Sequence, residues 1–269
     1  MKRLFITLTL ILVAFMANAQ FCPDSIYHPH AIDLGLPSGT KWACCNVDSD
    51  LSKLRPENNG SYYAWGETEE KEIYDWTTYI HCDGSMETCH DIGSDIASFQ
   101  NDENDAAHSH WGGAWVMPSV DHFQELVNNC SYNRTTINGV DGYQFTGPSG
   151  GTIFLPAAGF RWNDNLSDTD NYGYYWSSTL SPSSSSSAYC LVFNLDSAYW
   201  NYSSFRNYGH TVRPVIRGTN NIVNTKSSTD DTRQDVYNIY GIKVLDSITG
   251  INTLPSGIYI VNGRKIVVK

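Results

Sequence analysis

The chain has few charged residues, and most of its charges are negative. Only 17% of its 269 residues are charged, and 17 basic residues stand against 28 acidic ones. Nucleic acids and anionic lipid surfaces are bound through clustered positive charge, so we expect neither as a partner. A net charge of −11 favours instead a protein whose copies repel one another in solution.

The sequence also lacks the signatures of common catalytic sites. It has no Gly-x-Ser-x-Gly elbow and no His-Glu-x-x-His zinc motif. The glycine-rich turn at residues 147–151 lacks the Lys-Ser or Lys-Thr pair that a phosphate-binding loop requires. No two carboxylates stand out as a glycosidase pair. We therefore expect a protein that is not an enzyme and that needs no organic cofactor.

Only the amino terminus carries a long apolar run. Lys2 and Arg3 precede it, and the small residues Ala17 and Ala19 follow it, as in a secretory signal peptide. The run is too short to span a bilayer comfortably. We expect residues 1–19 to be removed and the mature chain to be secreted or held at the cell surface, without a transmembrane helix.

The chain contains seven cysteines, an odd number. An exported protein is expected to pair most of its cysteines. Cys82 and Cys89 close a short loop, for which a disulfide is expected, although the flanking histidines leave a four-ligand zinc site as an alternative. Cys45 and Cys130 are further disulfide candidates.

Aromatic residues are abundant, with 8 Trp, 17 Tyr and 10 Phe. Their rings either fill the core of a loop-rich fold or line a ligand surface, and the sequence leaves both roles open. In residues 199–205, YWNYSSF, strand alternation predicts that some rings are exposed among Asn and Ser, an arrangement suited to glycans or protein partners. The candidate ligand-binding residues are Trp162, Tyr199, Trp200, Tyr202, Phe205 and Tyr208.

Turn signals divide residues 20–216 into many short extended segments and one clear helix. Ser119 is placed to cap this helix, and apolar residues follow at spacings of three and four as far as Cys130. Asn138-Gly139 indicates a hairpin. These features predict an irregular α+β domain.

The stretch before this helix carries two further expectations. Residues 101–107, NDENDAA, are expected to cap a short helix or to hold Ca²⁺. His108 and His110 are expected on a strand, where they would share one face. The glycine pair between Trp111 and Trp115 indicates a close approach of two backbones.

The composition changes again after the main domain. Residues 217–234 lose aromatic residues and gain Asn, Ser, Thr and Asp, which predicts a linker. Residues 235–269 read as strands with a hairpin turn at Asn262-Gly263, which predicts a small all-β module.

Most of residues 31–216 is covered, in order, by the segments IDLGLPSGTKWACCNV, SYYAWGETEEKEIYDWTTY, NDAAHSHWGGAWVMPSVDHFQEL, GYQFTGPSGGTIFLPAAGF, YGYYWSST and GHTVRPV. Together these segments resemble the Fibrobacter succinogenes major paralogous domain found in exported proteins of Bacteroidetes. The resemblance implies the fold shared by C-type lectin-like and formylglycine-generating-enzyme-like domains. The final SGIYIVNGRKIVVK resembles the sorting domains of type IX secretion, which implies that secretion machinery as a partner and delivery to the cell surface.

The chain departs from these families at their functional sites. Formylglycine-generating enzymes use two nearby cysteines late in the domain, where this chain has Cys190 alone. Trp162-Asn163-Asp164 matches part of the calcium–sugar site of C-type lectins, so Asn163 and Asp164 are candidate Ca²⁺ ligands, but the Glu/Gln-Pro-Asn partner stretch is absent. We predict a non-enzymatic surface binding module for a glycan or a protein. An enzyme on the same scaffold or a structural surface component is the alternative.

Overall fold

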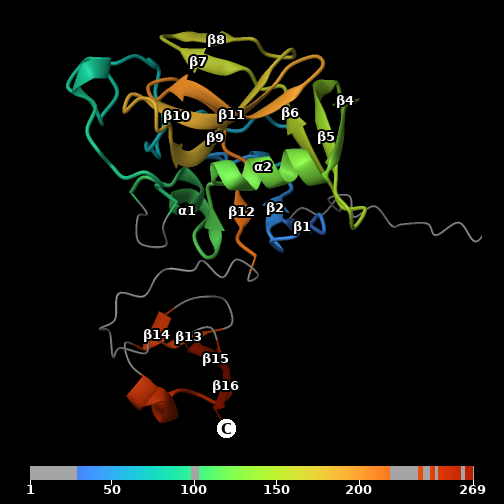
Figure 1. Cartoon of the computed structure of the whole chain (residues 1–269), viewed down its shortest axis with the longest axis vertical. Helices are drawn as coiled ribbons and strands as arrows, with labels where there is room; N and C mark the ends of the chain where they lie inside the picture. Colours follow the sequence, from blue (N-terminus) through green and yellow to red (C-terminus); the bar gives the residue numbers. More distant parts are fainter. Residues whose placement is uncertain are drawn as a thin grey trace, which may run out of the picture.

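The computed structural model describes residues 29–97, 103–218, 236–238, 243–245, 248–261 and 264–268. The predicted signal peptide, Cys22 and residues 219–234 of the predicted linker lie outside these ranges. The described part is mostly β, with several small antiparallel sheets and few helices (Figure 1). Within it, no helix is long and apolar enough to cross a membrane.

One sheet brings the two ends of the main domain together. Its order is β1-β2-β12-β3, with β1 at Ala31–Asp33, β2 at Lys41–Ala43, β12 at Val215–Ile216 and β3 at Trp115–Val116. The strands β1 and β2 pair antiparallel and are two of the short extended segments expected in this domain. Trp42 is fully buried at the centre of this sheet.

A second sheet, β4-β5-β6, is a meander. Its strands are β4 at Ser131–Ile137, β5 at Val140–Thr146 and β6 at Thr152–Pro156. Asn138 and Gly139 form the two-residue turn between β4 and β5, with φ values of 49° and 84°. Two consecutive positive φ angles match the strand twist of a tight hairpin, so the Asn-Gly prediction is confirmed.

The third sheet, β11-β10-β9, holds the ring-rich segment. Its strands are β9 at Gly173–Leu180, β10 at Ser187–Phe193 and β11 at Ala198–Phe205. Beyond it, β7 at Phe160–Trp162 and β8 at Asn165–Ser167 form a separate hairpin (Figure 1). The strand β8 lies inside a segment that sequence patterning assigned to a loop.

Helix α2, Val120–Asn129, lies against the β11-β10-β9 sheet (Figure 1). Ser119 accepts a hydrogen bond from the main-chain N–H of His122, and its own N–H donates to the His122 ring, which makes a reciprocal cap. Phe123 and Leu126 are fully buried on the apolar face. The predicted helix is therefore confirmed from its cap to its buried face.

A second helix, α1 at Ala106–Trp111, begins at the N-cap Asp105, as the acidic stretch suggested. His108 and His110 lie on this helix, so their assignment to a strand was wrong, and they do not share a face there. Gly112 ends the helix with φ 62°, and a Cβ added to it would meet no atom within 4 Å. Gly112 is thus required for the positive φ at the helix end, not for the close backbone approach that we expected.

The remaining elements are short. The 3₁₀ helices are η1 at Leu51–Lys53, η2 at Met86–Thr88 and η3 at Ile248–Thr253. Residues 61–66 make only a single bridge, between Tyr63 and His210. Tyr63 and Trp65 are nevertheless fully buried. Their rings, and not a strand ladder, hold this segment in place.

The carboxy-terminal part forms a separate four-stranded sheet of order β14-β13-β15-β16. Its strands are β13 at Val236–Asn238, β14 at Lys243–Leu245, β15 at Gly257–Val261 and β16 at Arg264–Val268. Val236, Tyr259 and Val261 form the centre of its own apolar cluster. The expectation of strands after residue 235 is confirmed.

Among the described cysteines, Cys82 and Cys89 form the one disulfide. The zinc alternative is therefore wrong for these two residues. Cys130 carries a buried thiol within the main apolar cluster, where it packs as a small apolar side chain, so its prediction as a disulfide partner is also wrong. Cys45 is buried beside Cys44, with 3.8 Å between their sulfur atoms, and makes no disulfide with another described cysteine.

The cap of α1 generates a prediction about pH. Asp105 is fully buried and accepts hydrogen bonds from the N–H groups of His108 and Met117, and burial raises its pKa to about 6 from an ordinary 3.8. Between these two values the folded chain holds a proton that the unfolded chain has lost. This residue therefore lowers stability as pH rises through that window.

We expect Asp105→Asn, which retains a capping oxygen, to remove this dependence. The unfolding free energy of the variant minus that of the wild type should rise with pH between about 4 and 6, by at most about 1.4 kcal/mol per unit. Urea titrations at several pH values measure it. A difference that stays flat across the window would contradict the assignment.

Candidate functional site: an aromatic platform

A continuous line of ring contacts crosses the surface beside β11. Trp76 contacts Phe205 at 5.8 Å between centroids, and Phe205 contacts Tyr208 at 5.7 Å. Phe160 then lies 5.5 Å from Tyr208 and 4.9 Å from Tyr174. We call the rings of this line, together with two neighbours, the aromatic platform. It comprises Trp76, Phe160, Tyr172, Tyr174, Tyr202, Phe205 and Tyr208.

Strand register explains why rings from β9 and β11 share one face. Tyr174 pairs with Val192, and Val192 in turn pairs with Tyr199. Tyr202 pairs with Cys190, two residues earlier on β10, so Tyr199 and Tyr202 belong to the same face. In a regular strand, side chains alternate between the two faces, which would place Tyr199 and Tyr202 on opposite faces. A bulge in β11 accounts for the difference, because it sets one extra residue between them.

The same bulge removes Trp200 from the candidate site. Trp200 is partly buried and packs against the main apolar cluster, whereas Tyr199 and Tyr202 are 52% and 50% exposed. Trp162 is 48% exposed and shares a face of β7 with Phe160, so it extends the platform along that strand. Of the six candidates, five thus belong to the platform or adjoin it.

Several interior tyrosines differ from the platform tyrosines in their hydroxyl contacts, although the buried Tyr63 hydroxyl also has no partner. Four buried tyrosines each donate their hydroxyl to a main-chain carbonyl oxygen at 2.6–2.7 Å, namely Tyr62, Tyr74, Tyr79 and Tyr175. The hydroxyls of Tyr172, Tyr174, Tyr202 and Tyr208 have no such acceptor in the described part of the chain. Burial raises the pKa of Tyr208, so its hydroxyl stays protonated and can donate to a ligand.

His210 forms the floor of the platform. Its ring is fully buried, lies 4.1 Å from the Trp176 ring and stacks on Tyr174 at 5.2 Å. The Nε2 atom is 2.8 Å from the hydroxyl oxygen of Ser204. Because burial penalises the charged imidazolium, the pKa of His210 falls to about 3. His210 is therefore neutral at physiological pH and packs as an aromatic ring.

Three acidic residues lie along one side of the platform. Asp164, Asp168 and Asp170 are exposed on the hairpin and loop that carry Phe160 and Tyr172. The Asp168 carboxylate is close enough to raise the pKa of Tyr174 further, after burial as the main cause. This rim would repel an anionic ligand.

The two candidate Ca²⁺ ligands lie in a turn. Trp162 pairs with Asn165 at the end of the β7–β8 hairpin, so Asn163 and Asp164 are its two turn residues, and Asn163 has φ 52°. The Asp164 carboxylate accepts a hydrogen bond from the Asn165 side chain. Among the described residues, no three His, Cys, Asp or Glu side chains are grouped as metal ligands. The geometry at Asn163 and Asp164 is that of a tight turn.

The described thiols are poorly suited to nucleophilic chemistry. Burial raises the pKa of Cys130 to about 12 and that of Cys190 well above its ordinary value. Since the thiolate is the reactive form, neither residue is an activated nucleophile. Cys44 has its sulfur 3.8 Å from the His30 ring, but the side chain is 2% exposed and is closed to an external substrate.

Ser204 and His210 resemble a hydrolytic pair in distance only. A base must accept the hydroxyl proton at the working pH, and an imidazole with a pKa of about 3 does not. No described carboxylate contacts the other ring nitrogen, Nδ1. The pair is suited to holding β11 against the 207–210 segment rather than to catalysis.

Comparison of the chain with models of protein families, with curated proteins and with solved structures gives no match. The platform must therefore be interpreted from its own geometry.

The buried imidazole of His210 yields a second pH prediction. Between pH 6.5 and about 3 the unfolded histidine is charged while the folded one is neutral. The stability that depends on neutral His210 is fully present above pH 6.5 and is lost as pH falls towards 3.

We expect the wild type to lose up to about 1.4 kcal/mol of unfolding free energy per pH unit from this residue. His210→Gln cannot titrate, so the advantage of the wild type over this variant should shrink as pH falls from 7 to 4. Chemical denaturation across that range provides the measurement. An advantage that grows on acidification would show that His210 is charged in the fold.

Proposed function

We propose that this protein is an exported, non-enzymatic binding module that holds an uncharged glycan chain on the aromatic platform. The contrast between interior and platform tyrosines carries the proposal. Rings whose hydroxyls have no partner in the protein offer a flat apolar face and a hydrogen-bond donor at the same place. A sugar ring presents the complementary combination of C–H face and peripheral hydroxyls.

The layout of the rings favours an extended ligand. Contacts run from Trp76 through Phe205 to Tyr208, which groups with Phe160 and Tyr174 around His210, so several rings are available to one ligand. Several stacking positions suit a polymer that binds at successive residues. The acidic rim and the net charge of −11 favour a neutral chain over an acidic one.

The predicted signal peptide supports export, and the resemblance of the carboxy terminus to type IX sorting domains supports display at the cell surface. A C-type lectin-like main domain is part of the same proposal, because small antiparallel sheets with few helices are compatible with it. The proposal includes neither a metal nor a cofactor. Buried thiols with raised pKa values count against an enzyme on this scaffold.

Ring removal tests the proposed function. We expect Tyr202→Ala, Phe205→Ala and Tyr208→Ala each to weaken glycan binding about tenfold, which corresponds to ~1.4 kcal/mol for one stacking ring. Titration calorimetry with neutral hexasaccharides of glucose, xylose and mannose measures the affinities. An acidic hexasaccharide of galacturonic acid should bind more weakly than the best neutral one.

Tyr189→Ala is the matched control, since Tyr189 lies on β10 next to Cys190 and so faces the other side of the same sheet. It should leave the affinity unchanged. Failure of every neutral hexasaccharide to bind at millimolar concentration would reject a glycan ligand. Equal binding by the wild type and all three ring variants would reject the platform as the site.

A further inference from the structure

Two rings of the platform are presented by a single tight turn, residues 205–208. The Tyr208 N–H donates to the Phe205 carbonyl at 3.1 Å, which closes the turn. The corner residues Phe205 and Tyr208 point their rings into the platform, in contact at 5.7 Å. The central residues Arg206 and Asn207 are 1% and 2% exposed. The turn thus presents the rings of its first and last residues, while its two central residues are buried and hold it in place.

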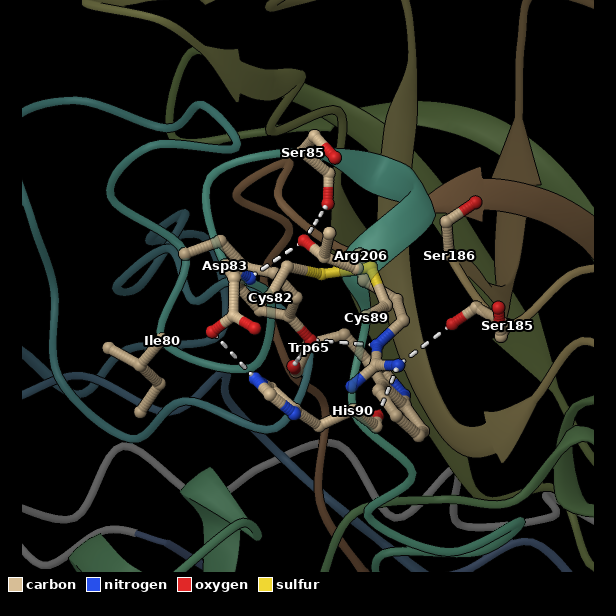
Figure 2. The surroundings of a disulfide bond; sticks show 12 residues. Trp65, Ile80, Cys82, Asp83, Ser85, Cys89, His90, Ser185, Ser186 and Arg206 are labelled. Atoms are coloured by element: carbon tan, nitrogen blue, oxygen red, sulfur yellow. Dashed lines mark hydrogen bonds and ion pairs between the residues drawn. A yellow bond between two sulfur atoms is a disulfide. The ribbon is translucent and has the colours of Figure 1, made fainter.

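Arg206 makes an unusual anchor, because it is a buried cation without an ion pair to a described carboxylate. Its Nε donates to the Tyr79 hydroxyl at 2.8 Å, and Nη1 donates to the carbonyl oxygens of Ser185 and His90 at 2.8 and 3.2 Å. Its guanidinium carbon lies 4.8 Å from the Trp65 ring centre. One side chain therefore joins the platform turn to three other segments (Figure 2).

The His90 carbonyl is held by the neighbouring disulfide. His90 directly follows Cys89, and its main-chain N–H donates to the His81 carbonyl at 2.7 Å, next to Cys82. The Cys82–Cys89 bond closes the loop between these positions, with Cα atoms 4.0 Å apart. Figure 2 shows the hydrogen bond from the Arg206 guanidinium to the His90 carbonyl, with the disulfide nearby.

Burying a cation is unfavourable unless its hydrogen bonds are satisfied by fixed acceptors. The acceptors of Arg206 are carbonyl and hydroxyl oxygens in loops, which have no sheet ladder to hold them in place. A covalent loop closure restricts where one of these acceptors can move. The disulfide-closed loop at residues 82–89 is therefore coupled, through Arg206, to the turn that carries Phe205 and Tyr208.

We propose that Arg206 is the positioning residue of the aromatic platform and that the Cys82–Cys89 disulfide fixes one of its acceptors, so that opening the disulfide weakens ligand binding without unfolding the main core. This inference rests on the proposed function for its effect on binding. The effect on the order of the 205–208 turn stands independently of any ligand.

Hydrogen exchange on the full chain without ligand tests the positioning directly. We expect Arg206→Lys, which keeps the charge but cannot reach three acceptors at once, to speed exchange of the Tyr208 amide about tenfold. The double variant Cys82→Ser/Cys89→Ser should speed it about threefold. Amides of β4 and β5 should keep wild-type protection in both proteins, which shows that the core remains folded.

Two controls accompany these variants, one substitution and one treatment with a reductant. Arg55→Lys changes an exposed arginine outside the platform and should alter neither exchange nor binding. The reductant TCEP, which opens the wild-type disulfide to two thiols, should reproduce the exchange of the double serine variant and add nothing to that variant itself.

Binding of the tightest neutral hexasaccharide completes the test. Affinity should fall about tenfold in Arg206→Lys and about threefold in the double serine variant. Unchanged exchange at Tyr208 in both variants would overturn the positioning role, whatever the glycan result. Faster exchange together with undiminished affinity, in a protein whose ring variants do lose affinity, would overturn the link to binding. If no glycan binds at all, the proposed function falls while the exchange result still decides the role of Arg206.

Discussion

The structure depends on hydrogen bonds from buried aromatic side chains to main-chain carbonyl oxygens. Its sheets are small, so many buried carbonyl groups lie in loops and need partners other than strands. Trp65 donates its indole N–H to the Ser177 carbonyl at 2.8 Å, and Trp176 donates to the Tyr63 carbonyl at the same distance. These two hydrogen bonds hold residues 63–65, which form no strand, against β9. Indole and phenol groups here supply hydrogen bonds to main-chain carbonyl oxygens that neighbouring strands supply in larger sheets.

Where the main-chain carbonyl acceptors end, the same residue types form the aromatic platform, which we propose as a binding surface. On the platform side of β9 the rings continue outward from Trp176 through His210 to Tyr174, and the outermost hydroxyls have no described acceptor. Interior and platform are therefore one aromatic assembly, in which four interior tyrosine hydroxyls donate to main-chain carbonyl oxygens and the platform hydroxyls do not. The neutral state of His210 keeps the floor of that assembly uncharged.

Sequence patterning predicted the parts of this molecule that depend on local signals. The Ser119 cap, the Asn138-Gly139 turn and the Cys82–Cys89 loop follow from residues close in the chain. The β11 bulge and the ring contacts of Trp76 do not, because they are set by pairing with β10 and by packing across distant segments. Strand alternation pointed to exposed rings within residues 199–205, whereas the grouping of Trp76, Phe160, Tyr172 and Tyr174 required the fold.

The division between interior and platform tyrosines is tested most directly by Tyr→Phe substitution, which removes one hydroxyl and little else. The unfolding free energy of Tyr62→Phe and Tyr175→Phe should fall by about 1–3 kcal/mol, because each leaves a buried carbonyl without its donor. The same change at Tyr202 or Tyr208 should stay within about 0.5 kcal/mol of the wild type. Equal losses in the two groups would contradict the account.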